Sequence, residues 1–280
     1  MNFDINLILI IELLILGSLA AFAAGMFGVG GGIIIVPGLS FILQSMGFNF
    51  DDSMHTAIAT SMVNMFFVAS GSVLANKKLN LIYWRVFFQS MIPIVIGVIA
   101  GIFISTALSG KILNIIFGVF LSSVSIKIIF DSSKKNRKLH SEIKTEYNVF
   151  ILIFSMLFIG VLAGLLGLGA GFAVVPFFIY YCLPIKEATG TSSAITFVVS
   201  VTGTILYLLK SNLGTIDSPY FYGYIFWFGI LIMLPTSFFL SHLGAVVKNN
   251  MHDNKLTIVF ALILSLVALK MIYPIIKELI

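Results

Sequence analysis

The sequence predicts an all-α, polytopic integral membrane protein that consists of two homologous halves. Of its 280 residues, 59% are hydrophobic and only 10% are charged, whereas soluble domains carry roughly 25% charged residues. Apolar stretches of about 20 residues, the length that crosses a bilayer as a helix, recur along the chain. A glycine-rich motif also occurs twice. Together these features favour a duplicated membrane protein over any soluble class.

About eight stretches are long and apolar enough to be transmembrane helices. Two further apolar segments, 30–46 and 169–182, each follow a glycine cluster and contain a proline. Each has only about 15 residues, or roughly 22 Å of helix, so we expect broken or re-entrant segments. If these two segments do not cross the membrane, eight helices cross it and the halves are parallel. If they do cross, ten helices cross it and the halves are inverted. The shortness of the two segments favours the first alternative. The eight stretches are residues 5–25, 54–75, 85–106, 111–130, 149–166, 188–210, 220–243 and 256–275.

A basic linker divides the chain. Residues 131–148 contain four Lys and one Arg against one Asp and two Glu. The positive-inside rule places this linker in the cytoplasm, between a first membrane repeat at 1–130 and a second at 149–280. No Lys or Arg precedes the first apolar stretch, so we interpret it as a membrane helix and not as a secretory signal.

The repeat is visible at two motifs. The stretch from Ala24 to Pro37 aligns with Ala163 to Pro176, and seven of the 14 aligned residues are identical, including every glycine of a G-x-x-G-x-G-x-G pattern. Further along, residues 57–61 (AIATS) align with 188–192 (ATGTS). Because the two motifs occur in the same order in both halves, duplication is the best interpretation.

The glycine motifs predict an anion site. Consecutive glycines disfavour a continuous helix, and each motif leads into a short helix whose first N–H groups have no helical partner. Such N–H groups at the positive end of a helix bind anions, and glycine lets a ligand approach the backbone. The alternative is that the glycines only pack helices closely. The candidate substrate-binding residues here are Gly28, Gly30, Gly31, Gly32, Gly167, Gly169 and Gly171.

The second motif adds polar groups inside the membrane. Hydroxyls of Thr60, Ser61, Thr191 and Ser192 can donate to an oxyanion, and Asn64 lies one turn beyond Thr60. The alternative for each hydroxyl is a bond to a carbonyl of its own helix.

Ionisable residues within or beside the spans are candidates for proton coupling, because charges in a membrane are costly and often functional. They are Glu12, His55 and Glu187. The single cysteine, Cys182, excludes an internal disulfide and a cysteine metal cluster. We find no nucleophile motif, no metal-ligand spacing and no basic face for nucleic acid, so we expect no enzyme, cofactor, metal or nucleic-acid partner.

The doubled glycine motif and the Thr-Ser motif of the second half resemble the sulfite exporter TauE/SafE family, also called the 4-toluenesulfonate uptake permeases. The resemblance covers nearly the whole chain. It implies secondary transport of sulfur-containing oxyanions such as sulfite, sulfonates or sulfoacetate across the bacterial inner membrane. Ala59 departs from the pattern, since the second half has Gly190 there. An anion channel of the same architecture is the alternative function.

Overall fold

The structure is a computed structural model that describes residues 6–133, 148–181, 183–210 and 218–251. Cys182, most of the basic linker and the predicted span at 256–275 lie outside these residues. The described elements are α1 (Leu7–Phe27), α2 (Gly32–Ser45), α3 (Phe50–Lys78), α4 (Trp84–Ala107), α5 (Gly110–Ser133), α6 (Val149–Leu166), α7 (Gly171–Tyr181), α8 (Ile185–Leu209), β1 (Phe221–Tyr222), β2 (Ile225–Phe226) and α9 (Trp227–Asn249).

The predicted all-α membrane class is confirmed. Among the described residues, α1, α3, α4, α6, α8 and α9 are long and apolar enough to cross a membrane, and α2 and α7 are shorter apolar helices. Large apolar side chains such as Leu7, Phe158 and Leu231 are exposed on the outside of the bundle. Ser, Thr and Asn side chains of α3 and α8 are buried. This apolar exterior is the surface that lipid requires.

One predicted span begins later than expected. The span predicted from residue 220 starts as a small antiparallel hairpin, in which Phe221 pairs with Phe226, and the helix itself begins only at Trp227. Gly223 has a φ of 58°, a left-handed conformation that turns the chain. Aromatic residues on both sides of this glycine favour strands, which explains why the apolar composition alone was misleading.

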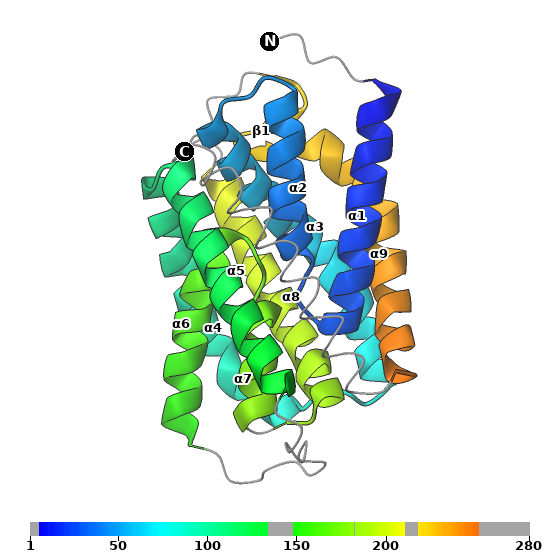
Figure 1. Ribbon diagram of the computed structural model, residues 1–280, viewed down its shortest axis with the longest axis vertical. Coiled ribbons are helices and arrows are strands. Elements are labelled where there is room, and N and C mark those ends of the chain that lie inside the picture. Colours follow the sequence, from blue (N-terminus) through cyan, green and yellow to red (C-terminus); the bar gives the residue numbers. More distant parts are fainter. Residues whose placement is uncertain (1–5, 134–147, 182, 211–217, 252–280) are drawn as a thin grey trace.

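The two short apolar segments reverse the chain. In Figure 1, α1 runs downward from the top of the bundle and α2 returns upward, whereas α6 runs upward from the bottom and α7 returns downward. The second half is therefore arranged upside down relative to the first. This is the inverted arrangement that the sequence left as the alternative to parallel halves.

Close helix contacts occur in matching pairs. A side chain at Gly25 of α1 would strike the Ser241 carbonyl of α9, and one at Gly164 of α6 would strike the Val98 carbonyl of α4. Likewise, Gly244 of α9 lies against α1. Small residues thus allow α1 to approach α9 and α6 to approach α4. Two copies of one unit, related by a two-fold axis, would make such reciprocal contacts.

Candidate functional site: two crossing glycine loops

Two glycine loops interrupt the apolar core. α1 ends where Gly28 takes a left-handed conformation, with a φ of 68°, and α6 ends in the same way at Gly167, with a φ of 66°. In each loop a second glycine is also left-handed, with φ of 81° at Gly30 and 77° at Gly169. These angles favour glycine, because a Cβ would clash with the backbone. Both loops are non-helical, as the sequence predicts.

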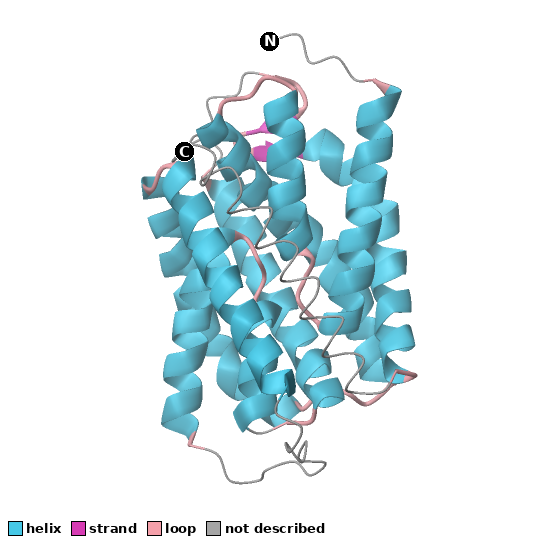
Figure 2. Cartoon of the chain, viewed as in Figure 1, coloured by secondary structure: helices cyan, strands magenta, loops and turns pink. Residues whose placement is uncertain are grey.

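The loops cross each other in contact. A Cβ on Gly32 would meet the Gly167 carbonyl, and one on Gly171 would meet the Gly28 carbonyl. Figure 2 places both loops at about half the height of the bundle, where the chain is drawn in pink between helices. The N-termini of α2 and α7 therefore meet in the middle of the protein.

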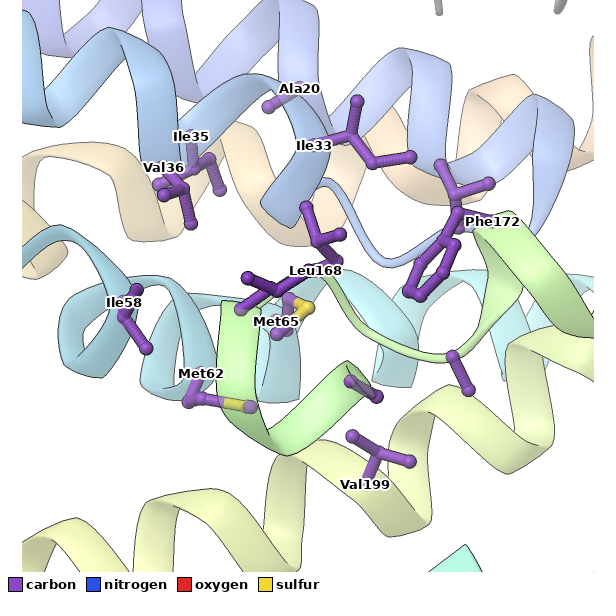
Figure 3. Packing of buried hydrophobic residues seen from close by; sticks show 14 of the residues in the cluster. Ala20, Ile33, Ile35, Val36, Ile58, Met62, Met65, Leu168, Phe172 and Val199 are labelled. Carbon is purple, nitrogen blue, oxygen red and sulfur yellow. The ribbon is translucent and has the colours of Figure 1, made fainter. Parts of the chain in front are cut away.

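Buried apolar side chains surround the crossing. Figure 3 shows Leu168, Met65 and Phe172 gathered around the two loops. All three are completely buried. Met65 of α3 and Thr196 of α8 both lie within contact of the Cβ positions of Gly30 and Gly169. Neither residue was singled out from the sequence, because nothing in a local pattern indicates which turn of a helix faces a distant loop.

Backbone N–H groups at the crossing are unpaired. The first bonds to the start of α2 run from Ile34 and Ile35 to the Gly31 carbonyl, both at 3.0 Å. Within the part of the chain that the structure describes, the N–H groups from Gly30 to Ile33 and from Gly169 to Phe172 make no hydrogen bond. Buried backbone donors are rarely left unpaired. Two helix N-termini with free donors thus converge in a buried region lined by apolar side chains.

The serines of the Thr-Ser motifs bind the loops of the opposite half. Ser61 Oγ donates to the Gly167 carbonyl at 2.8 Å and also to the Ile58 carbonyl. Ser192 Oγ donates to the Gly28 carbonyl at 3.1 Å. In this conformation both serine hydroxyls therefore donate to backbone carbonyls, because a loop carbonyl of the other half lies within hydrogen-bond distance of each. The serines position the glycine loops.

The threonines of the same motifs accept hydrogen bonds from the backbone. Thr60 Oγ1 accepts from the Phe226 N–H at 3.0 Å, and Thr191 Oγ1 accepts from the Tyr83 N–H at 2.9 Å. These donors precede α9 and α4, so each threonine fixes the start of a helix. A sequence signal for this existed: residues 82–84 (IYW) and 225–227 (IFW) form a third repeated motif that the sequence analysis missed.

Asn64 lies at the same depth as the crossing, one residue before Met65. Its Oδ1 accepts from Ser237 Oγ at 2.9 Å. Its Nδ2 is buried and has no hydrogen-bond partner. A buried amide donor without a partner costs free energy, so this position is unusual for a group that serves packing alone.

The three ionisable candidates lie away from the crossing. Glu12 is exposed on the outer surface of α1, whereas His55 is buried near the start of α3 and Glu187 is half-buried in the first turn of α8. His55 lies against the ring of Tyr224, with 5.2 Å between centroids. Burial, with Asp52 and Asp51 adding to it, raises the pKa of Tyr224. The helices α3 and α8, which hold His55 and Glu187 near their N-terminal ends, begin at opposite ends of the bundle (Figure 1).

Removal of the serine hydroxyls gives a first prediction. Among the described residues, the Gly167 carbonyl accepts a side-chain hydrogen bond from Ser61 only, whereas the Gly28 carbonyl accepts from Ser192 and also from Thr196 Oγ1 at 3.4 Å. We expect Ser61→Ala to lower the free energy of unfolding by about 1–3 kcal/mol, since a buried carbonyl loses its partner, and Ser192→Ala to lower it less. Thermal unfolding in detergent measures both. Equal losses would contradict this assignment of partners.

Comparison with known proteins places the chain in a family. The model of one protein family, described as sulfite exporter TauE/SafE, matches residues 13–271. The chain belongs to the TauE/SafE family. It is therefore a multi-pass membrane protein of a transporter family, and the predicted resemblance is confirmed.

Curated relatives of the TauE/SafE chain carry names that agree. A "Probable membrane transporter protein" of Haemophilus influenzae is 30% identical over 260 residues, covering 92% of this chain and 96% of the relative. The "Probable membrane transporter protein YunE" of Bacillus subtilis is 26% identical over 278 residues, covering 93% and 96%. A further one from Methanocaldococcus jannaschii is 27% identical over 267 residues, covering 95% and 96%. No solved structure matches the chain.

Proposed function

We propose that this protein is a secondary transporter that moves small sulfur-containing oxyanions, such as sulfite, sulfonates or sulfoacetate, across the bacterial inner membrane. The observation that carries the proposal is the convergence of two helix N-termini, with unpaired N–H groups, at the buried glycine crossing. Membership of the TauE/SafE family supports the substrate class. The proposed role is transport and not catalysis.

Electrostatics support an anion at the crossing. Each helix N-terminus is equivalent to roughly half a positive charge, so α2 and α7 together supply about one unit. Among the described residues near the crossing there is no Asp or Glu to balance it. A small oxyanion would accept from the free N–H groups at Gly30, Gly31, Gly32, Gly169 and Gly171. Ser61 and Ser192 would orient the two loops, and Asn64 Nδ2 is a further free donor.

Transport into proteoliposomes tests the proposal. The purified protein is reconstituted, and uptake of sulfite, a sulfonate, sulfoacetate, sulfate and chloride is measured with and without a proton gradient. We expect saturable uptake of at least one sulfur oxyanion, accelerated by a proton gradient through His55 or Glu187. Non-saturating anion current without coupling would favour the channel alternative, and absence of any sulfur-anion flux would refute the proposed substrate class.

The basic end of the bundle is proposed to face the cytoplasm. Lys77 and Lys78 end α3 at the same end at which α5 leads into the linker and α6 begins (Figure 1). The positive-inside rule then predicts the orientation. In a Cys182→Ser background, Lys78→Cys should resist an impermeant thiol reagent in intact cells, whereas Lys111→Cys, at the opposite end, should react. The reverse labelling pattern would overturn this orientation.

A further inference from the structure

A fully buried lysine lies near the basic end of the bundle. Lys248 of α9 has no exposed surface, and its Nζ donates to Asn76 Oδ1 of α3 at 2.6 Å. Asn76 Nδ2 in turn donates to the Ser72 carbonyl and to Ser193 Oγ of α8. Within the described residues Lys248 makes no ion pair. The charged groups that act electrostatically on Lys248 are Glu187 and Lys186. Lys186 Nζ itself donates to the Asn249 carbonyl.

In the described part of the chain, Lys248 has no carboxylate bonded to its ammonium group. Lysine is almost never fully buried unless it is paired, because removal of an ammonium from water is costly. An ammonium has three donors, and Asn76 satisfies one of them with a neutral carbonyl. Glu187 acts on this ammonium electrostatically but forms no ion pair with it, so the described residues supply no bonded counter-charge.

The lysine ends a row of buried polar residues between α3 and α9. On α3 the polar residues are four residues apart, except that the apolar Val68 lies between Asn64 and Ser72. Asn64, at the depth of the glycine crossing, is bonded to Ser237 of α9. From Asn64 to Asn76 the helix rises by roughly 18 Å. The row therefore leads from the crossing to the basic end. Its members are Thr60, Asn64, Ser72, Asn76, Ser237, Ser241 and Lys248, all buried.

The matching helices of the other half pack without such a row of polar residues. The matching contacts of the two halves pair Thr60 with Thr191 and Gly244 with Gly101. Counting onward along the helices pairs Asn76 with Tyr207 and Lys248 with Ser105, two buried and uncharged residues at the opposite end. The same counting places Ile195 and Ile94 opposite Asn64 and Ser237. At the positions that match Asn64, Ser237 and Lys248, the other seam thus holds Ile195, Ile94 and Ser105, and Lys210 at its end lies over the ring of Phe103.

We propose that the Lys248 ammonium, beside Asn76 and Ser193, forms a second binding position for a small oxyanion, between the glycine crossing and the basic end. Asn76 Nδ2 and Ser193 Oγ donate to the Ser72 and Gly190 carbonyls in this structure, so the ammonium is the group that binds the anion. The anion replaces Asn76 Oδ1 as the partner of the ammonium. This inference rests on the proposed transport of anions. It gives the two mouths of the protein different chemistry, because the position that matches Lys248 in the other half is the uncharged Ser105.

Neutralising the lysine tests the proposal. We expect Lys248→Gln to raise the KM for sulfite uptake into proteoliposomes by about ten- to one-hundredfold, since a hydrogen bond to a charged group is lost. Lys248→Arg keeps the charge and should raise the KM less. The exposed Lys78→Gln at the same end is the matched control, with the wild-type KM expected. A folded Lys248→Gln protein with the wild-type KM would overturn the proposal.

A second variant covers the case in which Lys248→Gln does not fold. Asn76→Asp keeps the lysine and puts a carboxylate oxygen where Asn76 Oδ1 now accepts from Lys248 Nζ. Because this carboxylate would hold the ammonium in place of the anion, we expect a folded protein with a raised KM, and a wild-type KM in this variant would refute the anion contact. Wild-type protein that transports no sulfur anion would instead refute the proposed function.

Discussion

Gly32→Ala and Gly171→Ala are each expected to abolish transport and to destabilise the protein. A methyl group on Gly32 would meet the Gly167 carbonyl and Leu168 Cα, and one on Gly171 would meet the Gly28 carbonyl and Val29 Cα. These neighbours are backbone atoms and cannot move aside as a side chain does. Overpacking of a core costs about 1–3 kcal/mol, and we expect the upper part of that range.

The matched control lies on the same helix as Gly32. At Gly38→Ala the new methyl group would meet only the side chain of Leu16, which can rotate away. We expect near-normal thermal stability and uptake for this variant. Because the two crossing contacts mirror each other, Gly32→Ala and Gly171→Ala should have similar effects, measured by thermal unfolding and by uptake into proteoliposomes. Wild-type transport in either variant would show that the loops do not need to cross closely.

Gly30→Ala is expected to abolish transport even when its packing defect is relieved. At this position an L-residue must adopt a left-handed backbone, which costs about 1–2 kcal/mol. The methyl group would meet Thr196 Cγ2, and also Met65 Sδ at 2.9 Å. It would also lie beside the free N–H groups, where the anion is proposed to bind. Packing and anion access therefore both predict a loss, and a second substitution is needed to separate them.

Thr196→Ser makes that separation. Serine lacks the Cγ2 methyl group but keeps the hydroxyl that donates to the Gly28 carbonyl. We expect the double variant Gly30→Ala/Thr196→Ser to regain part of the thermal stability lost in Gly30→Ala, while uptake stays absent. Thr196→Ser alone should transport normally. Recovery of uptake together with stability would show that Gly30 serves packing only, and would remove it from the proposed anion site.

Local features of the sequence were sufficient for the helices and for the glycine loops. Apolar runs place α1, α3, α4, α6 and α8 within a few residues of their observed bounds, because hydrophobic length is a local property. Gly28 and Gly167 end their helices because several glycines in succession disfavour a helix. The hairpin before α9 was missed, because its aromatic residues are as apolar as a membrane span.

Residue pairs far apart in the chain were beyond prediction from the sequence. Ser61 and Gly167 are 106 residues apart and Lys248 and Asn76 are 172 apart. Lys248 carried no signal of its own, since a lysine at the end of an apolar run usually lies in the headgroup region. Its burial depends on how closely Gly244 lets α9 approach α1 and on how Gly71 lets it approach α3.

By itself, the sequence determined the membrane class, the helical segments, the repeated motifs and the family, since each depends on composition or on short runs of residues. Only the tertiary structure decided that the chain runs in opposite directions in the two halves and that the loops cross in contact. It also decided that the serine hydroxyls donate to the opposite loop. The physical reason is that a buried donor or acceptor must find its partner wherever the fold brings one within reach.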